Sequence, residues 1–232
     1  MKLALMQPYF FPYIGYFTLV GAVDRFVFYD DVQYIKNGWI NRNRVLIAGK
    51  PAYITVPLLN ASASSRIDEV VIAPQGHWKR KMLESLRHAY GNAPCFDPVH
   101  ELVRSVLVPD VQRICELAKA SVYAVARYLE VGAEFVHSSS GYANRDLRGV
   151  GRVLDICRRE GASEYVNLPG GRDLYDATEF AAAGVQLRFV DPPATAYRQF
   201  GEPFQPNLSI IDVLMHNRPA QVRTMLASGV PA

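Results

Sequence analysis

The stretch KLALMQPYFFPYIGYFTLVGAVDRFVFY, residues 2–29, decides the fold of this 232-residue chain. It begins with a short apolar run at 2–6 and ends with an aromatic-rich run at 25–29, and such runs are typical of buried strands. Residues 12–21 lie between them and are long enough for about two or three helical turns. Strand, helix and strand in this order predict two parallel strands joined by a crossover helix, the smallest unit of a parallel sheet.

The middle of the chain is expected to be mostly helical. A glycine turn at 48–49 predicts a hairpin of residues 44–47 and 53–58, and a further strand is expected at 67–73. The segment at about 76–130 then carries apolar residues at helical spacing. The helices predicted within it are 77–90, 98–107 and 111–129.

The last hundred residues return to alternating strands and helices, as an α/β protein requires. The strands predicted here are 135–138, 165–168 and 186–190, and the helices are 147–157, 173–183, 209–215 and one from 219 onward. The fold prediction is a single α/β domain over residues 1–232. It has a mainly parallel sheet, helices on both faces, and a helical insertion in the middle of the chain.

Composition excludes several classes of protein. Half of the residues are hydrophobic and the net charge is only +3, which excludes disorder and a uniformly basic coat for nucleic acids. No apolar run approaches the roughly 20 residues that span a bilayer, and the first residues predict a strand instead of a signal peptide. The three cysteines, Cys95, Cys115 and Cys157, have neither metal spacing nor a disulfide pattern. We expect a soluble cytoplasmic protein without membrane insertion, of an oligomeric state that the sequence leaves open.

Residues 7–44 have an unusual composition. They hold eleven of the 26 aromatic residues, and the stretch 30–44, DDVQYIKNGWINRNR, combines aromatics with amides and cations. Such groups bind ligands by directional hydrogen bonds and by stacking, and four basic residues without an acid at 36–50 favour an anionic small molecule. The alternative is a solvated loop with aromatic residues at its rim. The residues predicted to bind substrate are Gln7, Tyr9, Tyr13, Tyr16, Gln33, Asn37, Trp39, Asn41, Arg42, Arg44, Gln199 and Asn207.

The candidate catalytic residues follow the second predicted strand. Ligands of open parallel sheets bind beyond the carboxyl ends of the strands, so the loops that begin at Gln7 and Asp30 are expected to share one crevice. Asp30 or Asp31 is the candidate base, and Lys36 is the candidate cation for the substrate. Because neighbouring residues at a strand end point in opposite directions, only one of the two carboxylates is expected to face the site. A turn role, an ion pair that holds Arg42 or Arg44 in place, or a metal-binding role are alternatives for them.

No metal site is predicted, because none of the five histidines pairs with another at ligand spacing. The sequence does not identify a cofactor.

Three further motifs have plain structural interpretations. Gly170-Gly171 follows a predicted strand and could approach a phosphate, but a simple turn is the favoured interpretation. Ser209 and Asp212 are spaced like a helix N-terminal capping box. The four arginines of one helix face, which we interpret as its solvated side, are Arg145, Arg148, Arg152 and Arg159.

Four segments resemble the WbqC-like family: 7–17 (QPYFFPYIGYF), 30–34 (DDVQY), 41–44 (NRNR) and 205–214 (QPNLSIIDVL). The resemblance covers most of the chain. It implies that the protein is associated with bacterial surface-polysaccharide (O-antigen) gene sets. Proteins of this family look like enzymes that modify sugars by acyl or amino-acyl (glycyl) transfer.

A second likeness lies at 12–16, where PYIGY is similar to the Pro-x-His-x-Gly-His signature of the nucleotidylyltransferase superfamily. In that superfamily the signature histidines hold phosphates, but here Tyr16 stands at the last of them. Tyrosine donates a hydrogen bond and carries no positive charge at neutral pH. Phosphate binding would then depend on Lys36, Arg42 or Arg44.

The leading functional hypothesis is a transferase that acts on a nucleotide-linked sugar or a similar anionic small molecule in surface-polysaccharide biosynthesis. An adenylate-forming or nucleotidyl-transfer enzyme with an altered signature is the first alternative, and a non-catalytic ligand-binding or scaffold protein is the second. An aminoacyl-tRNA is a candidate donor for the transferase.

Overall fold

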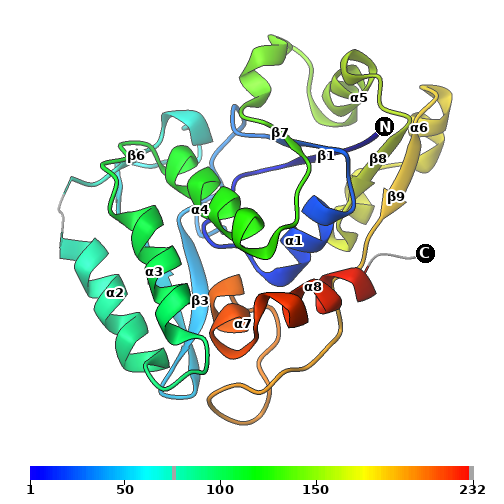
Figure 1. The fold of residues 1–232 in the computed structure, drawn as a ribbon. Coiled ribbons are helices and arrows are strands. Elements are labelled where there is room, and N and C mark those ends of the chain that lie inside the picture. The colour runs from blue at the N-terminus through cyan, green and yellow to red at the C-terminus, as the bar shows by residue number, and fades with distance from the viewer. Residues whose placement is uncertain (75–76, 230–232) are drawn as a thin grey trace.

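A computed structural model describes residues 1–74 and 77–229 of the chain and contains one five-stranded sheet (Figure 1). All four strand pairs of this sheet are parallel, and the strand order is β7-β2-β1-β8-β9. The strands are β1 (Lys2–Met6), β2 (Arg25–Phe28), β7 (Glu134–Val136), β8 (Glu164–Asn167) and β9 (Gln186–Phe189). The predicted parallel sheet is therefore confirmed. The predicted helical segment starts at residue 76 and the predicted domain ends at residue 232, and both of these ends lie outside the described residues.

Helices cover both faces of the sheet, as expected from its strands, which are apolar on both sides. Ala4, Phe26 and Phe28 point into one hydrophobic core, and their neighbours Leu3 and Val27 point into a second core on the opposite face. The helices of the first face are α1 (Ile14–Gly21), α4 (Ile114–Leu129), α7 (Ile210–His216) and α8 (Pro219–Ser228). The helices of the second face are α5 (Gly149–Glu160) and α6 (Ala177–Ala182).

The hairpin and the first two helices of the middle segment form a layer beside the sheet (Figure 1). Its hairpin consists of β3 (Arg42–Ile47) and β4 (Lys50–Thr55), paired antiparallel across the predicted turn. Helices α2 (His77–Tyr90) and α3 (Phe96–Leu107) pack against each other, and α3 packs against α4. The helical character of this segment is thus confirmed. Among the helices of the described residues, none is long and apolar enough to cross a membrane.

Two predicted elements are wrong in part. The strand expected at 67–73 is a 3₁₀ turn at Ile67–Glu69 followed by the short strand β6 (Val71–Ile72), which pairs with β5 (Leu58–Leu59). The turn forms because the amides of residues 67 and 68 donate to the carbonyls of residues 32 and 30 instead of to a neighbouring strand.

The helix expected from residue 173 begins later. Residues Pro169–Leu174 form a 3₁₀ turn, and α6 starts only after Asp176, whose carboxylate accepts a hydrogen bond from the Thr178 amide at 2.8 Å. An aspartate in this position is a strong helix start.

The start of α7 confirms one half of the predicted cap. The Ser209 hydroxyl accepts from the Ile211 amide at 3.3 Å, as a cap should. Asp212 does not complete a capping box: its fully buried carboxylate accepts from the hydroxyls of Tyr90 at 2.6 Å and Tyr197 at 2.7 Å. The Gln199 amide adds a third hydrogen bond at 3.1 Å. Asp212 thus fastens α2 and the segment before α7 to the core.

Candidate functional site

The strand order locates a topological switch point between β1 and β8. From β1 the chain moves outward to β2 and β7, and from β8 it moves outward to β9 on the other side. At such a point the two loops that leave the strands separate, and a crevice opens beyond the carboxyl ends. The loops concerned begin at Gln7, after β1, and at Leu168, after β8.

Two adjoining cavities lie at this crevice. The first, of about 470 Å³, extends along the carboxyl ends of β1 and β8, and the second, of about 410 Å³, lies toward β3. Both are lined by Tyr9, Tyr13, Trp39 and Gly170, so they adjoin at these residues, and we describe them together as one cleft with two lobes. We call these four residues, three of which are aromatic, the aromatic junction.

Each end of the cleft has its own lining. The residues found only in the first cavity, which we call the switch-point lobe, are Leu5, Met6, Gln7, Tyr29, Ile35, Asn167, Leu168, Gly171, Leu174 and Tyr175. The residues found only in the second, which we call the arginine lobe, are Pro12, Asn43, Arg44, Pro169, Pro192 and Asn207.

A buried asparagine holds the loop after β1 in shape. The Asn43 side-chain amide donates to the carbonyls of Phe10 at 3.2 Å and Phe11 at 2.8 Å, and its oxygen accepts from the Arg44 amide at 2.8 Å. The Ser209 hydroxyl also donates to the Phe11 carbonyl, at 2.7 Å. Buried backbone groups that cannot join a strand or helix need such partners. The cleft wall is therefore fixed by β3 and by the start of α7.

Among the described residues, Arg44 is the one charged residue that lines the two cavities. Its guanidinium carbon lies 5.6 Å from the centre of the Trp39 ring, and Nη2 lies 3.5 Å from the Asn207 carbonyl. Its Nε is buried and has no hydrogen-bond partner among the described residues. A buried N–H group without a partner favours an incoming acceptor.

The tyrosines of the cleft carry no charge at neutral pH. Burial raises the pKa of Tyr9, and burial together with the neighbouring Tyr9 raises the pKa of Tyr13 to about 12. Both hydroxyls are therefore protonated and do not repel an anion. The described residues give the cleft lining one cation and no anion, so the cleft is electrostatically suited to a negatively charged ligand.

The structure brings together six of the predicted binding residues. Those that line the cleft are Gln7, Tyr9, Tyr13, Trp39, Arg44 and Asn207. Tyr16 lies in the core with no exposed surface, and its hydroxyl donates to the Gln7 carbonyl at 3.0 Å. Tyr16 therefore supports the loop from behind instead of facing a ligand.

The other predicted binding residues lie outside the cleft lining. Gln33 and Asn37 are exposed, as is Lys36. Arg42 donates to the carbonyls of Gly38 at 3.3 Å and Asn37 at 2.5 Å and closes the turn before β3. The Asn41 amide is buried and donates to the Val56 carbonyl at 2.9 Å. Gln199 belongs to the Asp212 network described above.

Asp31 lies in a buried ion pair and not in the cleft lining. Its side chain is 0% exposed and lies 2.7 Å from the Arg152 guanidinium and 2.8 Å from that of Arg145. Burial alone would raise the pKa of Asp31, but hydrogen bonds from Arg152, Ser139 and Arg145 together hold it below its usual value. Arg152 is only 4% exposed, so the arginine face predicted to be solvated is partly buried. Arg152 can be buried because its guanidinium pairs with the ionised carboxylate of Asp31.

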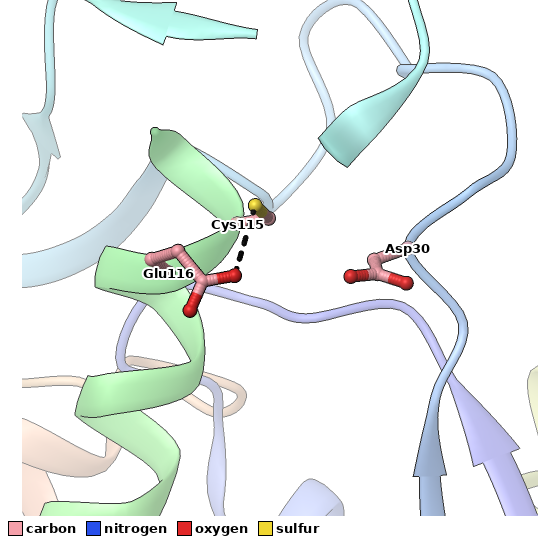
Figure 2. Close-up of side chains that lie close together, drawn as sticks. All are labelled: Asp30, Cys115 and Glu116. Carbon is pink, nitrogen blue, oxygen red and sulfur yellow. Dashed lines mark hydrogen bonds between the residues drawn. The ribbon is translucent and has the colours of Figure 1, made fainter. Parts of the chain in front are cut away.

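Asp30 lies in a second buried cluster, at the first turn of α4. Figure 2 shows Asp30 after β2 opposite Cys115 and Glu116, three side chains whose ligand atoms lie within 4.8 Å of one another. The Lys119 ammonium lies 2.7 Å from the Asp30 carboxylate and 2.9 Å from that of Glu116. Burial raises the pKa of the Cys115 thiol to about 12, so it is no thiolate at neutral pH. The protein's own cation therefore occupies the position that a metal ion would need.

Several cleft residues were not among the predicted ones. Asn167 is the last residue of β8, and Gly171 comes from the loop that follows it, where the double glycine Gly170-Gly171 is interpreted from the sequence as a turn. The position of β8 beside β1 gives this loop its role, and strand order is not visible in the run of residues 165–168 itself. A double glycine directly after a strand was the signal that could have found it.

Comparison with known proteins gives two findings. The chain is 28% identical over 218 residues to a Mycobacterium tuberculosis (strain ATCC 25618 / H37Rv) protein described as uncharacterized protein Rv1507c, and the match covers 93% of each chain. No solved structure matches the chain. The model of the WbqC-like protein family matches residues 7–224, and the chain therefore belongs to the WbqC-like family.

Proposed function

We propose that the cleft binds a nucleotide-linked sugar or a similar anionic small molecule, and that the protein is a transferase that adds an acyl or amino-acyl (glycyl) group to it. The WbqC-like family supports a role in polysaccharide-associated biosynthesis, and an acylated sugar fits such a role. An aminoacyl-tRNA remains our candidate for the donor of an amino-acyl group. We assign no base to Asp30 or Asp31, because both carboxylates are buried in ion pairs.

One observation carries the proposal: within residues 1–74 and 77–229, Arg44 is the one charged residue that lines the cleft at the switch point. The guanidinium has an unused buried N–H group, and the tyrosines beside it are neutral. A phosphate or diphosphate group would pair with the Arg44 guanidinium at the cleft, and the aromatic junction would stack on the rest of the ligand.

The test begins with binding. Isothermal titration calorimetry with a panel of nucleotide sugars compares the wild type with Arg44→Gln and with Arg87→Gln, which removes the same charge from α2. We expect at least about tenfold weaker binding for Arg44→Gln alone, because hydrogen bonds to charged groups contribute about 1.5–3 kcal/mol. Equal affinities for all three proteins, or no binding to the wild type, would contradict the proposal.

The transfer step needs a second measurement. The protein is incubated with the nucleotide sugar that binds best and with an acyl thioester or glycyl-tRNA as donor. Mass spectrometry should then detect the mass of the sugar plus one acyl or glycyl group, in wild type and Arg87→Gln but not in Arg44→Gln. Tight binding without any product would favour the alternative of a non-catalytic binding protein.

Nucleotidyl transfer is the second candidate, and the position of α1 favours it. This helix follows β1 directly and begins beside Tyr13, so the segment that resembles the nucleotidylyltransferase signature borders the cleft. Tyr16 cannot replace a phosphate-binding histidine, since its hydroxyl is bound to the Gln7 carbonyl. Release of pyrophosphate from a nucleoside triphosphate in the presence of magnesium would support this candidate over acyl transfer.

A further inference from the structure

We infer that the switch-point lobe holds the flat base of a nucleotide and that Gln7 is the residue that recognises it. The inference rests on the proposed function, because it takes the anionic group of the same ligand to lie at Arg44. It adds an orientation: the base lies beyond β1 and β8, and the phosphate lies toward β3.

The lining of the switch-point lobe is the first argument. Five of its lining residues are aliphatic or carry a thioether, and of these Leu5 and Leu168 are buried core residues; the five are Leu5, Met6, Ile35, Leu168 and Leu174. A sugar ring would bury several hydroxyls here, and each buried hydroxyl without a partner costs free energy. A flat heterocycle with few hydrogen-bonding groups suits this surface better, since it can stack between aliphatic and aromatic side chains.

Two polar side chains of the lobe, those of Asn167 and Tyr175, already have hydrogen-bond partners. The Asn167 amide donates to the Tyr165 hydroxyl at 3.2 Å, and its oxygen accepts from the Leu168 amide at 2.7 Å. The Tyr175 hydroxyl lies 3.3 Å from that of Tyr165. These two side chains hold the loop after β8 in place.

Gln7 differs from these groups. Its side chain lines the lobe, yet its Oε1 is buried and has no hydrogen-bond partner among residues 1–74 and 77–229. An unpaired buried acceptor is rare because it has lost its water without a replacement. The last torsion of a glutamine side chain is soft, so rotation of the amide can turn Oε1 toward the lobe. An N–H group of a base would then donate a hydrogen bond to Oε1, a contact that bases commonly make with glutamine.

Two exposed apolar side chains at this lobe fit the same ligand. Ile35 is 52% exposed and Leu174 is 70% exposed, and they come from the loop after β2 and the loop after β8. A base between these loops would cover part of both side chains. Their exposure is expected for the two sides of an apolar slot.

The test measures base recognition separately from anion binding. Calorimetry with pyrophosphate, ribose 5-phosphate, ADP and UDP establishes what the base adds. Two analogues that lack the N–H group, N6,N6-dimethyl-ADP and N3-methyl-UDP, are measured beside their parents. The proteins are the wild type, Gln7→Leu, and Gln186→Leu as the matched control on exposed strand β9.

We expect ADP or UDP to bind wild type at least about tenfold more tightly than pyrophosphate. Gln7→Leu should lose about tenfold for that nucleotide, the value of one hydrogen bond of about 1.4 kcal/mol. The methylated analogue should bind wild type as weakly as the parent binds Gln7→Leu, and the variant should not weaken it further. Gln186→Leu should behave like the wild type.

The opposite results separate the two proposals. If pyrophosphate binds in an Arg44-dependent way and the base adds nothing, or if methylation has no effect in the wild type, this inference fails while the proposed function stands. If none of the anions binds, the proposed function fails and this inference fails with it. The methylated analogues keep the test decisive even if Gln7→Leu does not fold, because they need only the wild type.

Discussion

Arg152 binds the carboxylate of Asp31 through its Nη2 nitrogen, which lies 2.8 Å from Oδ1 and 2.7 Å from Oδ2. Arg145 adds a third contact at 2.8 Å, and the Ser139 hydroxyl donates to Oδ1. The end of β2 is thereby joined to α5 and to the segment before it. Both carboxylate oxygens already have donors, so Asp31 stabilises the scaffold that positions the cleft.

Replacing Asp31 by asparagine should therefore destabilise the protein. Removing one partner of a buried ion pair leaves the other charge uncompensated, and this costs about 3–5 kcal/mol. We expect Asp31→Asn to lower the free energy of unfolding in urea by that amount, whereas Asp146→Asn, at an exposed position, should change it by less than about 0.5 kcal/mol. A variant of full stability would contradict this prediction and show that the ion pair does not stabilise the scaffold.

The same ion pair predicts a loss of stability in acid. Because the pKa of Asp31 is lower in the folded protein than in the unfolded chain, its contribution is complete above the unfolded value of about 4 and is lost as the pH falls through the folded value. Glu116, beside Lys119, has a lowered pKa and acts in the same direction. Urea unfolding between pH 7 and pH 2 should show stability falling below about pH 4 in the wild type. A curve of the same steepness for Asp31→Asn would argue against a contribution from this residue.

The sheet could be predicted from the sequence because each strand is a short apolar run that ends at polar or turn residues. Residues 2–6 and 25–29 need only their own side chains and the helix between them to be recognised. Their burial on both faces follows from Leu3 and Val27 as well as Ala4 and Phe26, which point to opposite cores. Local pattern and tertiary structure agree here.

The site was less predictable because its residues are brought together by strand order and by ion pairs across the chain. Gln7 and Arg44 were recognisable by type and position, but the loop after β8 gains its role only because β8 lies beside β1. Asp31 and Arg152 are 121 residues apart, and nothing in either neighbourhood indicates the other. The composition of 30–44 indicated polar groups; it could not show that several of them hold the backbone instead of a ligand.

A methyl group at Gly15 should disturb the cleft. A Cβ atom there would lie 2.5 Å from the Tyr13 ring, so the ring would have to move, and Tyr13 belongs to the aromatic junction. We expect Gly15→Ala to bind its best nucleotide probe about tenfold more weakly, because the displaced Tyr13 ring no longer offers the ligand the same stacking surface, and a stacking contact contributes about 0.5–1.5 kcal/mol. Gly21→Ala, in the same helix with free space around its Cβ position, is the control. Unchanged affinity of Gly15→Ala in calorimetry would place the ligand away from Tyr13.

The contact between Gly201 and Gly49 should be needed for the segment before α7 to reach the β3–β4 hairpin. Gly201 has a φ of 121°, and a Cβ atom there would lie 2.9 Å from the Gly49 Cα and 3.0 Å from its carbonyl oxygen. Backbone atoms cannot turn aside as a side chain can, so Gly201→Ala should lower the free energy of unfolding by about 1–3 kcal/mol. The hydrogen bond from Gln199 to the buried Asp212 should keep the beginning of this segment attached to the core. Backbone amide hydrogen exchange should therefore rise first around residues 200–205. Gly141→Ala, where a Cβ atom meets nothing within 4 Å, controls for the substitution itself. Equal stability of the two variants in urea would show that the hairpin and this segment are not in such close contact in solution.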